Sequence, residues 1–108
     1  MKKSYCPIDT FINAIKGKRK GTIILHLKQG DKRYNELVKL MPDISERMLT
    51  KQLKELETDG LINRTVFPEV PPRVEYSLTG LGREIHPILK GMFKGGILFE
   101  KSIDASEN

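Results

Sequence analysis

The segment from residue 68 to 72 constrains the fold most, because it holds three prolines in five positions. Proline lacks a backbone N–H, so this segment cannot form the hydrogen-bond ladder of a sheet. Apolar and polar residues alternate on both sides of it, in residues 61–67 and 73–78. This alternation is typical of β-strands. Two strands around a short, stiff loop predict a β-hairpin.

Apolar residues at helical spacing predict five helices around this hairpin. They cover about residues 7–16, 20–29, 34–41 and 46–59 before the hairpin and about 80–102 after it. Residues 31–33 are polar and turn-like, and Pro87 is expected to kink the last helix. The predicted order is therefore α-α-α-α-β-β-α. This mostly α chain with a β-hairpin has the elements of a winged helix-turn-helix, in which the hairpin is the wing.

The length of 108 residues predicts a single domain over residues 1–108, with a core small enough that dimerisation would extend it. Lys and Arg number 19 against 14 Asp and Glu, which gives a formal net charge of +5. A basic surface attracts polyanions such as nucleic acid or an anionic membrane, although many basic proteins bind neither. No apolar stretch approaches the ~20 residues of a spanning helix, and no apolar run follows Lys2 and Lys3. We therefore expect a cytoplasmic protein without membrane association.

Residues 46–59 predict an amphipathic helix with a leucine face and a polar face. Ser45 is a favourable N-cap, and Gly60 is typical of the position after the last turn. The polar face carries four residues at spacings i, i+3, i+4 and i+7: Arg47, Thr50, Lys51 and Lys54. In a major groove, Ser45 and Arg47 are best placed for base edges, whereas Lys51 and Lys54 could reach bases or phosphates.

A charged helix face is ordinary by itself, because every surface helix has a solvated side. The hairpin that follows carries Arg64 and Arg73, and a basic wing beside a basic helix offers two adjacent contacts to one duplex. This pattern favours DNA binding. The alternative is a winged helix that serves only protein interactions, which would carry apolar residues on the outer face of this helix. An RNA-binding module is disfavoured because the major groove of A-form RNA excludes a helix.

The sequence contains no motif for catalysis or metal binding. It has no nucleophile–base pair and no glycine-rich phosphate loop. His26 and His86 lie far apart, and the chain has one cysteine, so ligands for a zinc site are too few. We expect no enzyme activity, no cofactor and no metal, and we expect surface or packing roles for both histidines.

Five segments in order resemble the HxlR-type transcription regulators, which are relatives of the MarR regulators. They are CP at 6–7, RYNEL at 33–37, ISERMLT at 44–50, LKELETDGLI at 53–62 and RTVFPEVPPRVEYSLT at 64–79. The resemblance covers about residues 5–95. It implies a winged helix fold, a homodimer built through the N-terminal and C-terminal helices, and binding to double-stranded DNA at palindromic operators as a repressor or an activator. The reading helix falls on residues 45–59 and the wing on residues 66–73.

The resemblance also concerns the helix before the turn, where Arg33 and Tyr34 join the expected DNA-binding residues. One departure lies after the first helix. The family often has Gly-Lys-Trp there, whereas this chain has Gly17, Lys18 and Arg19. An aromatic packing group is therefore missing in front of the second helix.

Several members of the family resemble sensors of oxidants or electrophiles that use a cysteine at an N-terminal position. Cys6 matches this position. Its thiol is expected at a helix start and near Lys2 and Lys3, and both features favour the reactive thiolate. The products could be a disulfide between the Cys6 residues of two subunits, a mixed disulfide or an alkylated adduct. An inert, half-buried thiol is the alternative. Control by a non-covalent ligand is a further alternative.

Overall fold

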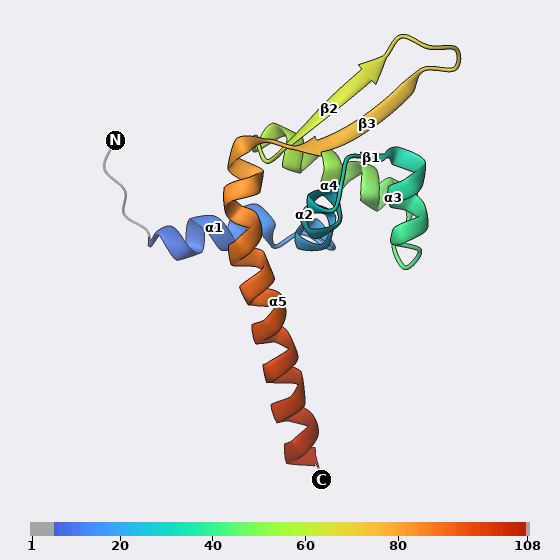
Figure 1. Ribbon diagram of the computed structural model, residues 1–108. Coiled ribbons are helices and arrows are strands. Elements are labelled where there is room, and N and C mark those ends of the chain that lie inside the picture. The colour runs from blue at the N-terminus through green and yellow to red at the C-terminus, as the bar shows by residue number, and fades with distance from the viewer. Residues whose placement is uncertain (1–5, 108) are drawn as a thin grey trace.

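The computed structural model describes residues 6–107, which form a mostly helical body with one antiparallel sheet (Figure 1). Four helices precede the hairpin: α1 (Pro7–Ile15), α2 (Lys20–Lys28), α3 (Tyr34–Leu40) and α4 (Glu46–Thr58). The hairpin consists of β2 (Ile62–Phe67) and β3 (Arg73–Leu78), and α5 (Gly80–Glu107) follows it. This order confirms the predicted fold class, a winged helix-turn-helix.

The hairpin projects from the helices as the wing (Figure 1). Its strands pair antiparallel, from Ile62 opposite Leu78 at the base to Phe67 opposite Arg73 at the outer end. The residues at the base are buried, whereas Val66 near the outer end is half exposed. The wing is therefore anchored in the core at its base and leaves its outer end open to a partner.

A third strand, β1 (Lys32–Arg33), corrects the turn expected over residues 31–33. Lys32 lies opposite Tyr76 and Arg33 opposite Glu75, so the sheet order is β1-β3-β2. Two polar residues are too few to show the period of a strand. Their pairing depends on where the fold places β3.

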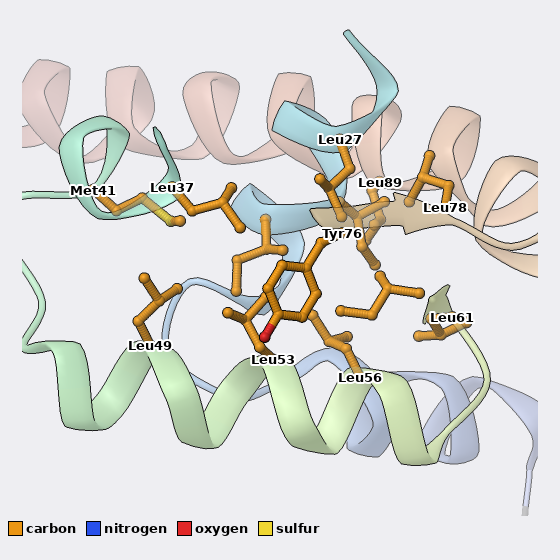
Figure 2. Close-up of a cluster of buried hydrophobic side chains, with 13 residues drawn as sticks. Leu27, Leu37, Met41, Leu49, Leu53, Leu56, Leu61, Tyr76, Leu78 and Leu89 are labelled. Atoms are coloured by element: carbon orange, nitrogen blue, oxygen red, sulfur yellow. The ribbon is translucent and has the colours of Figure 1, made fainter. Parts of the chain in front are cut away.

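The core is a single cluster of buried hydrophobic side chains from α2, α3, α4, the base of the wing and α5 (Figure 2). Leu49, Leu53 and Leu56 point into it from one side of α4 (Figure 2). Ile23 and Ile24 of α2 are completely buried. The second helix is thus well packed although the aromatic group that the resemblance leads us to expect in front of it is absent.

Arg19 stands at the position of that aromatic group. Its backbone has a φ of +67°, and its guanidinium forms an ion pair with Asp43. The pair joins the link between α1 and α2 to the turn between α3 and α4. A polar contact therefore occupies this part of the surface.

Helix α5 starts at the base of the wing and extends far from the rest of the molecule (Figure 1). Thr79 is its N-cap, because its Oγ1 accepts a hydrogen bond from the backbone N–H of Gly82 at 3.0 Å. The helix continues through Pro87 and ends at Glu107 rather than near residue 102. Residues 103–107 contain no glycine or proline, so their polar character does not end the helix.

Candidate nucleic-acid interface

Helix α4 begins at Glu46, as its sequence predicts, and ends at Thr58, one residue before the predicted end at Asp59. Ser45 Oγ accepts a hydrogen bond from the backbone N–H of Met48 at 3.0 Å, which makes Ser45 the N-cap. After the last turn, Gly60 has a φ of +77°, a conformation that glycine adopts without strain. The caps set the ends of α4, and the buried leucine face determines which side of it faces away from the core.

That side, the outer face of α4, consists of Arg47, Thr50, Lys51 and Lys54, all of which are exposed. Ser45 is exposed at its N-terminal end. The five residues expected on the reading helix therefore lie together on one accessible surface. Three of them are cations. A helix N-terminus with exposed donors and positive charge is suited to meet a polyanion.

Helix α3 meets α4 through the hydroxyl of Tyr34. This hydroxyl lies 3.1 Å from Thr50 Oγ1 and donates to Glu46 Oε1 at 3.2 Å. Tyr34 and Thr50, both expected in the DNA-binding set, are thus brought into direct contact. Arg33 is exposed at the start of α3, where its backbone N–H donates to Glu36 Oε1 at 2.8 Å. The Tyr34 bonds thus join α3 to α4 at the exposed surface, whereas the Arg33 bond caps α3 locally.

Arg64 lies on β2 directly opposite Tyr76 of β3, and its side chain is exposed. It lines a cleft of about 270 Å³ between α4 and the wing. The other lining residues are Thr50, Lys54, Glu57 and Tyr76. The cleft joins the outer face of α4 to the wing, so Arg64 and Lys54 share one site.

Arg73, the second wing arginine, has a different environment. Its Nη1 lies 3.2 Å from Glu69 Oε2, and its Nε lies 3.0 Å from Glu75 Oε2. The guanidinium carbon lies 4.1 Å from the centroid of the Phe67 ring. Two carboxylates and an aromatic face therefore surround this cation.

Cys6 lies apart from the outer face of α4, at the N-cap position of α1. Its thiol is exposed, and its carbonyl oxygen accepts a hydrogen bond from the backbone N–H of Asp9 at 3.0 Å. Lys2 and Lys3, which were expected near the thiol, lie outside the described residues.

Among residues 6–107, no three His, Cys, Asp or Glu side chains gather as a metal site would need. The pKa of His26 is lowered by burial and by Lys32. The pKa of His86 is lowered by burial and by Lys28 and Lys90. These surroundings favour the neutral imidazole in both cases. Within the same range, none of the helices has the length and apolar character to cross a bilayer.

No pattern in the sequence indicates the buried contact between α2 and α4. Lys20 is buried, and its Nζ lies 2.6 Å from Glu55 Oε1. This ion pair lowers the pKa of Glu55. A Cβ at Gly17 would lie 2.5 Å from Gln52 Oε1 and 2.7 Å from Lys20 Cε, so a larger residue there would displace these two side chains. Long charged residues are rarely buried without a partner, but no local pattern identifies that partner.

The model of the family described as HxlR-like helix-turn-helix matches residues 14–103. The chain belongs to this family. HxlR-family proteins are transcription regulators and not enzymes, and the helix-turn-helix implies DNA binding. The chain is thus a transcription regulator with a helix-turn-helix fold.

Individual relatives agree with this assignment. The HTH-type transcriptional regulator YdeP of Bacillus subtilis is 49% identical over 102 residues, which cover 94% of this chain and 80% of YdeP. The solved structure of the redox regulator HypR in its reduced form is 42% identical, with a TM-score of 0.86. The match covers 93% of this chain and 99% of that structure. The oxidized form of HypR is 47% identical over 84% of this chain and 94% of that structure, with a TM-score of 0.79.

Proposed function

We propose that the protein binds a palindromic operator as a homodimer, in the cytoplasm, with α4 of each subunit in a major groove. The observation that carries this proposal is the outer face of α4, where Arg47, Thr50, Lys51 and Lys54 are exposed above a buried leucine face. Ser45 and Arg47 stand at the end of the helix that approaches base edges in proteins of this architecture. A protein-interaction module would instead expose apolar residues there.

Selection of bound duplexes from random DNA tests the proposal. We expect an enriched palindrome whose half-sites are about one helical turn, ~34 Å, apart. A variant with Arg47→Ala, Thr50→Ala and Lys51→Ala should lose this enrichment, because all three changes lie on the exposed side and leave the core intact. Lys18→Ala, an exposed change outside α4, is the control. Failure to enrich any sequence, or the same sequence from the triple variant, contradicts the proposal.

The dimer is proposed to form through α1 and α5. Apolar side chains are exposed on both helices, and α5 extends well beyond the core of its own chain (Figure 1). The exposed apolar residues of these helices are Ile8, Ile12, Leu81, Ile88, Met92, Phe93, Ile97, Leu98, Phe99 and Ile103. A monomeric protein rarely exposes an apolar surface of this extent, and a second copy would cover it.

We further propose that Cys6 regulates operator binding. The support is its exposed thiol at the start of α1, next to the helix assigned to the dimer, and the similarity of the chain to the redox regulator HypR. Two Cys6 thiols would form one disulfide between subunits, giving up two protons and two electrons. Diamide accepts both and becomes the corresponding hydrazine. The new bond would alter the angle between the subunits and so the spacing of the two α4 helices.

The test is operator affinity before and after diamide treatment, in the wild type and in Cys6→Ser. Diamide should change the affinity of the wild type only, and a reductant should restore it. Non-reducing electrophoresis should show a diamide-dependent dimer that Cys6→Ser cannot form. Equal affinities throughout would remove Cys6 from the mechanism.

A cavity beside α1 favours control by a non-covalent ligand as the second candidate. It measures about 280 Å³, and its walls are mainly apolar side chains of α1 and α5 and of the turn after α4. Phe11, Leu61 and Ile85 are among its lining residues. Benzoate and phenol do not oxidise thiols, so an effect of either compound on operator affinity would come from non-covalent binding and not from oxidation of Cys6. An affinity change that they cause in Cys6→Ser supports ligand control, whereas no effect of either compound argues against it.

A further inference from the structure

The two arginines of the wing stand in opposite electrostatic environments. Arg73 is within 3.2 Å of Glu69 and within 3.0 Å of Glu75, so two carboxylates compensate one cation. Its guanidinium also lies against Phe67, 4.1 Å from the ring centroid. A phosphate approaching Arg73 would have to displace these partners and would meet their negative charge.

Arg64 stands instead at an open cleft with a second cation. The cleft of about 270 Å³ is lined by Lys54 of the outer face of α4 and by Arg64 of β2. Glu57 also lines it, so the lining carries two positive charges and one negative charge. The field in the cleft therefore favours one added anion.

Hydrogen-bond donors complete the cleft. Tyr76 lines it and is 7% exposed, and Figure 2 shows its hydroxyl directed toward α4. Burial raises the pKa of Tyr76, although the adjacent Arg64 guanidinium opposes the shift. The hydroxyl consequently keeps its proton near neutral pH and can donate it. Thr50 also lines the cleft, but its hydroxyl lies 3.1 Å from that of Tyr34. Because the Tyr34 hydroxyl donates to Glu46, the Thr50 hydroxyl donates to Tyr34 and leaves Tyr76 as the hydroxyl donor of the cleft.

We propose that the cleft between α4 and β2 seats one phosphate of the DNA backbone. Lys54 and Arg64 supply the charge, the Tyr76 hydroxyl donates to a non-bridging oxygen, and Arg73, which is already paired with two carboxylates, contacts no phosphate. The position of the cleft favours DNA as the source of the phosphate, because the DNA backbone passes between a helix in the major groove and a wing beside the minor groove. The inference rests on the proposed operator binding and identifies one contact within it.

Operator duplexes with a single methylphosphonate test this phosphate contact, because each methylphosphonate removes the charge of one phosphate. The duplex is the one enriched by selection, and the substitution is moved along each half-site. At one phosphate per half-site, the wild type should bind about tenfold more weakly. That loss should shrink in Arg64→Gln and in Tyr76→Phe, because each variant has already lost one contact to this phosphate. It should persist in full in Arg73→Gln, the matched control in the same wing.

Salt dependence gives a second measurement. The double variant Lys54→Gln with Arg64→Gln should lower the slope of log affinity against log salt by about 0.9 for each half-site, whereas Arg73→Gln should leave it unchanged.

Glu57→Gln should tighten binding, because it removes the carboxylate that opposes the anion. Tyr76→Phe retains the ring that packs in the core, so its folding is preserved.

Three results would overturn the inference. The first is a methylphosphonate loss that Arg64→Gln leaves intact at every position. The second is an Arg73→Gln variant that behaves as Arg64→Gln does. The third is a wild type that binds no selected duplex, and this result alone also overturns the proposed function.

Discussion

At the scale of single residues, the exposed and the buried cations of this protein have different tasks. Arg47 is exposed on the first turn of α4, where its guanidinium is available to a partner. Lys20 is buried and holds Glu55, so it joins α2 to the inner side of the same helix. One cation is accessible to a partner, and the other holds α4 against α2.

Arg47→Ala should weaken operator binding by about 1–3 kcal/mol and relax sequence preference at one base pair per half-site, because a base contact is lost. Fluorescence anisotropy with the selected duplex and its single-base variants measures both effects. Lys18→Ala should leave them unchanged. If operator affinity and sequence preference are both unchanged in Arg47→Ala, Arg47 does not contact a base.

Glu55→Gln should change how stability depends on pH. The ion pair with Lys20 places the pKa of Glu55 below its ordinary value of 4.5. The folded state therefore binds fewer protons than the unfolded state near that pH. The stabilisation is complete above the unfolded pKa and is lost as the pH falls through the folded pKa.

Thermal unfolding between pH 7 and pH 3 measures this effect. The wild type should have the higher Tm at pH 7, and its advantage over Glu55→Gln should disappear as the pH approaches 3. Glu84→Gln, an exposed change on α5, should follow the wild type throughout. A constant difference between wild type and Glu55→Gln would show that the carboxylate charge is not the cause.

At the scale of elements, the position of α5 depends on its close approach to the start of β2. A Cβ added at Gly82 would lie 2.2 Å from the carbonyl oxygen of Leu61 and 3.2 Å from Leu78 Cδ2. The backbone carbonyl cannot move aside as a flexible side chain could. The glycine therefore lets the first turn of α5 pack directly on the base of the wing.

Gly82→Ala should lower the free energy of unfolding by about 1–3 kcal/mol, because the new methyl group overpacks this contact. Chemical denaturation measures the loss. Gly80→Ala is the control at the same helix end, since a Cβ there meets nothing within 4 Å, and it should be neutral to within about 0.5 kcal/mol. Equal stability of the two variants would mean that α5 can shift without cost.

At the scale of the whole molecule, α5 extends beyond any core that this chain alone can provide (Figure 1). Phe93 and Leu98 are 59% and 69% exposed, so an isolated chain leaves much apolar surface in water. Burial of such side chains contributes about 1.5–3 kcal/mol each. A second copy of the chain would recover this free energy.

Leu98→Glu should therefore shift the protein from dimer to monomer, because burial of an unpaired carboxylate opposes association. Sedimentation velocity measures the change, and operator affinity should fall with it since only one α4 then reaches the DNA. Lys94→Glu, an exposed change on the same helix, separates the loss of an apolar contact from added charge. A wild type that sediments as a monomer would contradict the dimer.

The sequence by itself determined the elements whose cause is local. The leucine spacing, the Ser45 cap and Gly60 specify α4 and its outer face, because each acts within a few residues along the chain. Alternation around the proline loop likewise specifies the hairpin, whose strands pair through the register of Ile62 with Leu78. The sequence also placed the candidate reading residues on one side of a helix, since a helical period decides that without reference to the rest of the fold.

Only the tertiary structure decided the properties that depend on a distant partner. Lys32 and Arg33 become a strand because β3 lies beside them, and Lys20 is buried because Glu55 lies within reach. Arg64 and Arg73 look alike in the sequence as wing cations. The fold gives Arg64 an open cleft with Lys54 and gives Arg73 two carboxylates, because long-range packing rather than local pattern sets the charges around a side chain.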